Sequence, residues 1–131
     1  MHALQNKFDP TGRHLLIDVW GAVHLDDPKL MGVVLVNAAE ACGATVVGLS
    51  MKHFGDGAGV TGFAMLSQSH ISVHSWPEYG YAAFDIFVCG NADPYEVMPV
   101  LKSAFSPERV RVTECIRGDP SDETSFVTRR F

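Results

Sequence analysis

The sequence lacks the features that several classes of protein require. No apolar run reaches the roughly 18 residues of a membrane-spanning helix, so no such helix is expected. The 10 Lys and Arg residues form no runs and the formal net charge is −5, which argues against a nucleic-acid partner. Three scattered cysteines make no disulfide framework and suit a reducing compartment. The first dozen residues lack the basic-then-apolar order of a signal peptide, so we expect a cytoplasmic protein with no membrane partner.

The length and the hydrophobic pattern predict one small domain. The 131 residues, 47% of them hydrophobic, suffice for a single core, so residues 1–131 are expected to form one domain. Apolar periodicity predicts strands at residues 14–20, 45–52, 60–66, 71–75, 81–89 and 109–116. Helices are predicted to start at Asp27-Pro28 and Asp93-Pro94, because Asp caps free N–H groups and Pro fits the first helical position. Pro99 is expected to kink the second helix, and residues 118–131 are expected to form a polar tail.

The order of these elements predicts the fold class. The sequence β-α-β-β-β-β-α-β indicates an α+β two-layer sandwich, with a mainly antiparallel sheet and its helices on one face. Two helices cover only one face of such a sheet. The other face needs a further layer, most simply a second subunit.

Most of the chemically active side chains fall within residues 67–90. They are Ser69, His70, His74, Glu78, Asp85 and Cys89. A serine before a histidine at a strand edge is usually structural. Neighbours on a strand point to opposite faces and no G-x-S-x-G run is present, so a conventional serine hydrolase is not expected.

The histidines and the cysteine of this stretch also have plain structural interpretations. His70 and His74 share one face of a regular strand but lie about 13 Å apart along it, too far for one zinc ion, so no metal is predicted. Either histidine can instead be packed or hydrogen-bonded. Cys89 can be a small buried hydrophobe. Asp85 shares a strand face with Cys89, without an assigned role.

Phe54 stands in the glycine-rich loop of residues 53–59 and allows two interpretations. Its ring either pins the loop to the core or offers a face on which a ligand ring stacks. The loop precedes no helix with a nucleotide-binding fingerprint, so a phosphate site is not expected there.

Taken together, these residues match one family. The run S-H-x-x-x-H-x-W-P-E-x-G of residues 69–80 is followed by D-x-x-x-C-G of residues 85–90. Further matching segments, in the same order, are residues 12–18, 43–46, 53–54, 59–62, 93–94 and 107–110. Over roughly residues 12–117 the chain resembles the single-domain prokaryotic S-adenosylmethionine decarboxylases.

This resemblance implies that the chain cleaves itself between Gln68 and Ser69. In the family, the hydroxyl of the serine matching Ser69 attacks the preceding carbonyl, and the histidine matching His74 assists the elimination that follows. The residue matching Thr61 supports processing. The products are a β chain of residues 1–68 and an α chain of residues 69–131, whose first residue becomes a pyruvoyl cofactor.

The resemblance also implies the reaction of the processed enzyme. The pyruvoyl group forms a Schiff base with S-adenosylmethionine and accepts the electrons released with carbon dioxide, and the cysteine matching Cys89 returns a proton. The product is the aminopropyl donor for spermidine, a polyamine. Glu78 is implied to hold the ribose and Phe54 to stack on the adenine. Family members of this size have the active site between two subunits, so a homodimer is expected.

Three departures from the family keep alternatives open. Gln68 replaces a glutamate, Thr61 replaces a serine, and the loop after Phe54 reads Gly-Asp-Gly-Ala instead of a run with Ser-Pro. The change in this loop leaves open the alternative of a pyruvoyl-dependent arginine or ornithine decarboxylase, in which Asp56 pairs with the basic side chain. Asp56 can equally be a solvated turn residue. A third alternative is an unprocessed, non-catalytic homologue.

Overall fold

The computed structural model describes residues 10–123 and 125–131 of the chain. A seven-stranded sheet has the order β2-β3-β4-β5-β1-β6-β7, and each neighbouring pair of strands is antiparallel. The elements are β1 (Gly12–Trp20), α2 (Pro28–Ala41), β2 (Val46–His53), β3 (Val60–Leu66), β4 (Ser69–Trp76), η1 (Pro77–Tyr79), β5 (Tyr81–Cys89), η2 (Pro94–Glu96), α3 (Val97–Phe105), β6 (Arg109–Arg117) and β7 (Phe126–Arg130).

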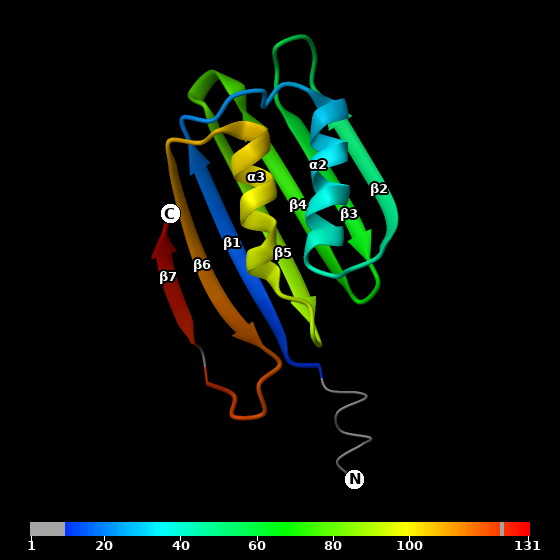
Figure 1. Ribbon diagram of the computed structural model, residues 1–131, viewed down its shortest axis with the longest axis vertical. Coiled ribbons are helices and arrows are strands. Elements are labelled where there is room, and N and C mark those ends of the chain that lie inside the picture. The colour runs from blue at the N-terminus through cyan, green and yellow to red at the C-terminus, as the bar shows by residue number, and fades with distance from the viewer. Residues whose placement is uncertain (1–9, 124) are drawn as a thin grey trace.

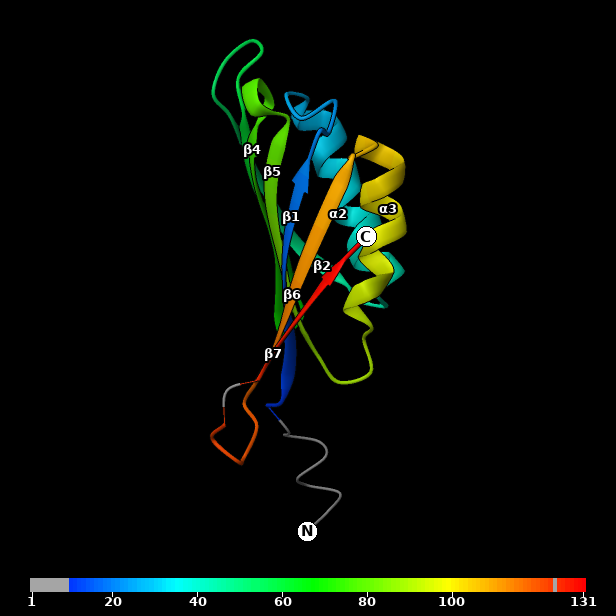
Figure 2. The same cartoon turned by 90° about the vertical axis from the view of Figure 1, so that its left-hand side faces the viewer.

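The helices α2 and α3 lie together on one face of the sheet, and the other face is bare (Figures 1 and 2). The alternation of β5 accounts for the two faces: Ala82, Phe84, Ile86 and Val88 are buried in the core beneath the helices. The side chains between them point to the opposite, open face and are half-buried. The predicted α+β two-layer architecture is confirmed.

Within the described part of the chain, no helix is long and apolar enough to cross a membrane.

Two local predictions are corrected. The segment after Asp93 is first a 3₁₀ turn, and the α-helix α3 begins only at Val97. Pro99 therefore lies in the first turn, where its missing N–H removes no intrahelical hydrogen bond and gives no cause for a kink. Residues 118–131 were expected to form only a polar tail, whereas Phe126–Arg130 forms the strand β7, which pairs with residues 111–115 of β6.

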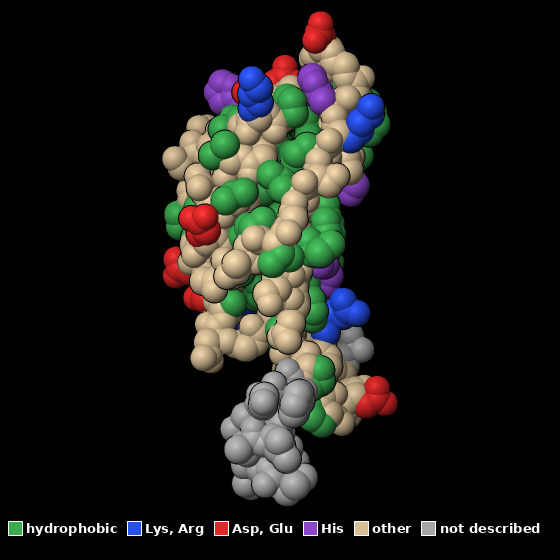
Figure 3. Space-filling model, turned by 90° about the vertical axis from the view of Figure 1, so that its right-hand side faces the viewer, with side chains coloured by type: hydrophobic (Ala, Val, Ile, Leu, Met, Phe, Trp, Pro, Cys, Tyr) green, Lys and Arg blue, Asp and Glu red, His purple; other side chains and the backbone are tan. Residues whose placement is uncertain are grey.

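The side of the molecule formed by α2 and the edge strand β2 carries exposed hydrophobic side chains. Val33 on α2 is 56% exposed, and Leu49 on β2 is 45% exposed. These two side chains line a shallow groove between α2 and β2. Figure 3 looks onto this edge and shows hydrophobic side chains over it with few charged groups among them.

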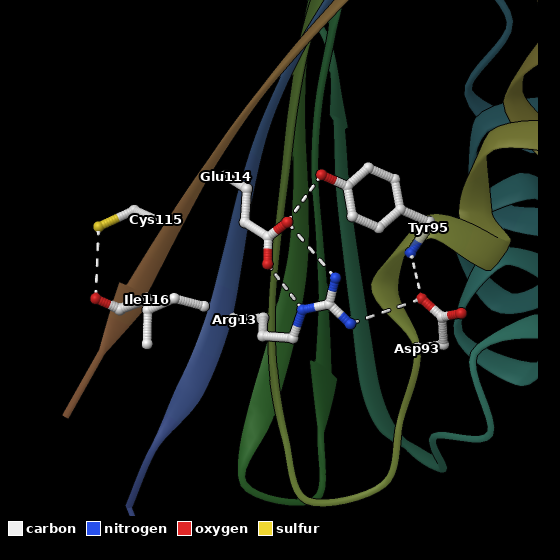
Figure 4. Close-up of polar contacts among 6 residues, drawn as sticks. All are labelled: Arg13, Asp93, Tyr95, Glu114, Cys115 and Ile116. Carbon is white, nitrogen blue, oxygen red and sulfur yellow. Dashed lines mark hydrogen bonds and ion pairs between the residues drawn. The ribbon is translucent and has the colours of Figure 1, made fainter. Parts of the chain in front are cut away.

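A polar cluster on the helix side joins the start of β1 to β6 and to the turn after β5 (Figure 4). Glu114 of β6 is buried and accepts hydrogen bonds from Arg13 Nε at 2.7 Å and from the Tyr95 hydroxyl at 2.8 Å. Arg13 also lies 3.8 Å from Asp93. The hydrogen bond from Arg13, supported by the one from Tyr95 and opposed by burial, lowers the pKa of Glu114. The cluster thus fixes the turn that follows Cys89.

We expect Glu114→Gln to lower the free energy of unfolding by about 1–2 kcal/mol at neutral pH, since a charge-assisted hydrogen bond to a partly exposed arginine is lost. Because the folded-state pKa of Glu114 is lowered, this stabilisation is present above the ordinary glutamate pKa of about 4.3 and disappears as the pH falls through the folded-state value. Urea unfolding of both proteins across this range measures the difference. Glu40→Gln, at an exposed glutamate of α2, is the control. If the difference in free energy of unfolding between Glu114→Gln and the wild type does not change with pH, the stabilisation does not come from the Glu114 carboxylate.

Candidate active site

The tight turn between β3 and β4 carries the bond for which cleavage is predicted. Gln68 has a φ of 63°, a left-handed conformation that is strained for a residue with a Cβ. Ser69 follows as the first residue of β4, and its hydroxyl donates to the Ser67 carbonyl at 3.2 Å. The Cys89 thiol at the end of β5 lies 3.7 Å from the Gln68 carbonyl oxygen. Gln68, Ser69 and Cys89 thus lie together and are called the cleavage end.

The other predicted residues gather at the opposite end of the same strands. Thr61 Oγ1 of β3 and His74 Nδ1 of β4 are 3.2 Å apart, within hydrogen-bonding distance. Glu78 lies exposed in η1, directly after β4. Phe54 stands in the loop between β2 and β3 and its side chain is 62% exposed, so it does not pin the loop to the core. Phe54, Thr61, His74 and Glu78 are called the binding end.

The two ends are far apart within one chain. In Figure 1 the β3–β4 turn and the end of β5 lie at the lower end of the sheet, and the β2–β3 loop and η1 lie at its upper end. Ser69 and His74 both belong to β4, and the five residue steps from one to the other span about 17 Å at the usual rise of a strand. One chain alone therefore does not bring His74 to the bond before Ser69.

Midway between the two ends, three strands contribute a polar cluster on the open face. Asp85 Oδ2 of β5 lies 2.6 Å from His14 Nε2 of β1 and 2.8 Å from His70 Nε2 of β4. The Ser72 hydroxyl donates to the other carboxylate oxygen of Asp85. Burial favours the neutral acid, but the hydrogen bonds from Ser72, His14 and His70 outweigh it and the pKa of Asp85 is lowered.

Sequence reasoning gave no role to this cluster. His14 and Asp85 are 71 positions apart in the sequence, and only the register of β1 on β5 brings them together. The expectation that His70 and His74 do not share a ligand is consistent with their partners, since His70 contacts Asp85 and His74 contacts Thr61.

Two hollows lie near opposite ends of the strands. A groove of about 490 Å³ beside the binding end is lined by Asp18, Trp20, Trp76, Tyr79, Tyr81 and Arg111. Within it, Asp18 accepts hydrogen bonds from Tyr81 and from Arg111. Burial, together with the Asp18 carboxylate, raises the pKa of Tyr81 to about 12, so this phenol stays protonated near neutral pH. A second cavity of about 590 Å³ adjoins Cys89 and Arg13 at the cleavage end.

Of the other two cysteines, Cys42 is the C-cap residue of α2, on the helix side of the sheet. It is buried in the core and its thiol donates to the Ala38 carbonyl within α2. Burial raises the pKa of Cys42 to about 11, so its thiol is almost fully protonated near neutral pH and is a poor nucleophile. Cys115 on β6 is half-buried.

Comparisons with known proteins identify the family of the chain. A sequence model described as S-adenosylmethionine decarboxylase matches residues 13–118. The S-adenosylmethionine decarboxylase proenzyme of Methanococcus maripaludis is 43% identical over 110 residues, which cover 82% of this chain and 89% of the relative. The proenzyme of Thermomicrobium roseum is 39% identical over 108 residues, which cover 82% of this chain and 93% of the relative.

Among solved structures, the adenosylmethionine decarboxylase of Aquifex aeolicus superposes with a TM-score of 0.74 at 29% identity, covering 87% of this chain and 96% of that chain. The family match spans most of the sequence, and the fold agrees with that of a solved member. The chain belongs to the S-adenosylmethionine decarboxylase family.

Proposed function

We propose that the protein is a self-processing, pyruvoyl-dependent decarboxylase that converts S-adenosylmethionine into the aminopropyl donor of spermidine synthesis. One observation carries the proposal: in a chain of this family, the strained turn at Gln68 precedes Ser69 and lies against the Cys89 thiol. The proposal covers cleavage into residues 1–68 and 69–131.

The geometry of the turn supports the first step of processing. The Ser69 hydroxyl attacks the carbonyl carbon of Gln68, the C–N bond breaks, and an ester replaces the amide. This shift is uphill from a relaxed amide, and strain at Gln68 reduces that difference. A base then removes the α-proton of Ser69, and the carboxylate of residues 1–68 leaves. The resulting dehydroalanine hydrolyses to a pyruvoyl group and ammonia.

His74 is the base expected for that elimination, and its distance from Ser69 supports a site made by two copies of the chain. A two-fold axis that runs just above the open face, parallel to the sheet and perpendicular to its strands, would stack two open faces with their strands antiparallel. The binding end of each copy then covers the cleavage end of the other. We infer a homodimer in which Ser69 and Cys89 of one protomer act with His74 and Thr61 of its partner.

The same pairing supports recognition of a nucleoside. Phe54 offers an exposed ring for stacking on adenine, and the Glu78 carboxylate can accept hydrogen bonds from ribose hydroxyls. The loop that holds Phe54 is closed by backbone hydrogen bonds from Phe54 to Gly59 and from Ala58 to Gly55. Gly59 is needed there, because a Cβ would collide with the Ser75 carbonyl oxygen.

Other chain groups complete the reaction. A pyruvoyl group at position 69 would supply an electron sink for the carbon–carbon bond that breaks. Cys89 lies against the same turn, so its thiol is positioned to protonate the carbon that loses carbon dioxide. A closed sheet-to-sheet interface would exclude water from this step.

The substrate is tested by the release of carbon dioxide from carboxyl-labelled S-adenosylmethionine, arginine and ornithine. We expect release from S-adenosylmethionine alone, and none by Ser69→Ala. Phe54→Ala should raise KM by about tenfold, since stacking of an aromatic ring contributes about 1–1.5 kcal/mol. Phe126→Ala, which removes an equally exposed ring of β7, is the control. Release from arginine or ornithine alone would move the protein to the basic amino-acid decarboxylases and assign Asp56 to binding.

The shared site is tested by co-expression of Ser69→Ala and His74→Ala chains with different tags. Each variant alone has no intact site, whereas a purified mixed dimer has one, so about half of the wild-type activity per dimer should return. Ser69→Ala with Cys89→Ala is the matched control: both changes lie at the cleavage end, so no site is restored. An inactive mixed dimer of Ser69→Ala and His74→Ala would show that the site lies within one chain.

A further inference from the structure

The cluster at the middle of the open face brings three metal-binding atoms together. His14 Nε2, His70 Nε2 and Asp85 Oδ2 all lie within 4.8 Å of one another. In the sheet, His14 and His70 both stand opposite Phe87, one on each side of β5. Their imidazoles therefore reach the same carboxylate oxygen from two neighbouring strands, at 2.6 Å and 2.8 Å.

The surrounding side chains hold these groups in place. The Ser72 hydroxyl donates to Asp85 Oδ1 and leaves Oδ2 directed at the two histidines. The ring of Phe63 stacks on His70 at a centroid distance of 5.6 Å, and Phe87 meets His14 edge-on at 5.5 Å. A carboxylate oriented by a hydroxyl and imidazoles fixed by neighbouring rings are typical of a preorganised ligand set.

We propose that His14, His70 and Asp85 bind a first-row divalent transition-metal ion such as Zn²⁺. Two imidazole nitrogens and one carboxylate oxygen are ligands that such ions prefer. Around a tetrahedral ion with bonds of about 2.0–2.1 Å the ligand atoms lie roughly 3.3 Å apart. From their present distances of 2.6 Å and 2.8 Å, His14 and His70 would therefore withdraw from Asp85 Oδ2 by about 0.7 Å and about 0.5 Å. In the metal-bound state the ion takes the place of the protons on Nε2, and each neutral imidazole carries its single ring proton on Nδ1.

The site is accessible from the open face. The side chains of His14, His70 and Asp85 retain 17%, 28% and 21% of their exposure. A fourth coordination position therefore faces outward, available to water or to a group of a second copy. If the chain is cleaved before Ser69 as proposed above, His14 belongs to the product of residues 1–68. His70 and Asp85 belong to the product of residues 69–131. The ion then joins the two chains.

The test is a titration of tag-free, chelator-treated full-length protein with Co²⁺, read by its ligand-field absorption, and with Zn²⁺, read by calorimetry. We expect one ion per chain, or one per two chains if two copies share it. His14→Gln, His70→Gln and Asp85→Asn should each weaken binding by about a hundredfold or more. Ser72→Ala should weaken binding by about tenfold, as for other partners of ligands.

His24→Asn is the matched control, because His24 is an exposed histidine with a left-handed φ of 62° that asparagine tolerates. It should bind as the wild type does, and circular dichroism should show every variant folded. Wild-type protein that binds no more tightly than Asp85→Asn would overturn the proposal and leave a hydrogen-bonded cluster only. Neither result depends on decarboxylation, so the metal site and the proposed activity are tested independently of each other.

Discussion

The two-residue alternation of β4, β5 and β1 is the constraint on which the rest of the structure depends. On one face it buries residues such as Ile71, Phe84 and Leu15 beneath the two helices. On the other face it presents polar and aromatic side chains such as His14, Phe63 and Asp85. No element of the described chain covers that face (Figure 2). A register slip of one residue would exchange the two faces, so the packing of the core and the placement of the site are determined together.

The arrangement along the strands explains how a short chain can supply two different parts of a site. The cleavage end needs a strained turn, which only the connection between two strands provides. In the proposed site, the binding end uses an exposed ring and a carboxylate, which a loop and the 3₁₀ turn η1 provide at the opposite end of the strands. Antiparallel pairing of two copies would bring these parts together without any added domain. It would also place the His14–Asp85–His70 cluster of one protomer near the same cluster of its partner, at the centre of the interface.

Much of the fold could be predicted from the sequence, because Asp-Pro helix starts, alternating strands and glycine stops are local signals. β7 could not be predicted in this way. Its five residues are exposed, its pattern is not alternating, and it lies beyond residue 118, where the family match ends.

The candidate site residues were chosen from motif and resemblance, but their separation into two ends could not be predicted in this way. Ser69 and His74 are close in sequence, and only an extended strand between them makes the distance large. The contact of His14 with Asp85 depends on pairing across 71 positions, which no local pattern encodes.

The central claim is that this chain breaks its own backbone before Ser69 and converts that serine. Denaturing intact-mass spectrometry of the purified protein tests it most directly. The account predicts two species: residues 1–68, and residues 69–131 lighter than the unmodified fragment by the mass of one ammonia. A single species with the mass of all 131 residues after long incubation would contradict it, and so would a fragment that starts with an unmodified serine.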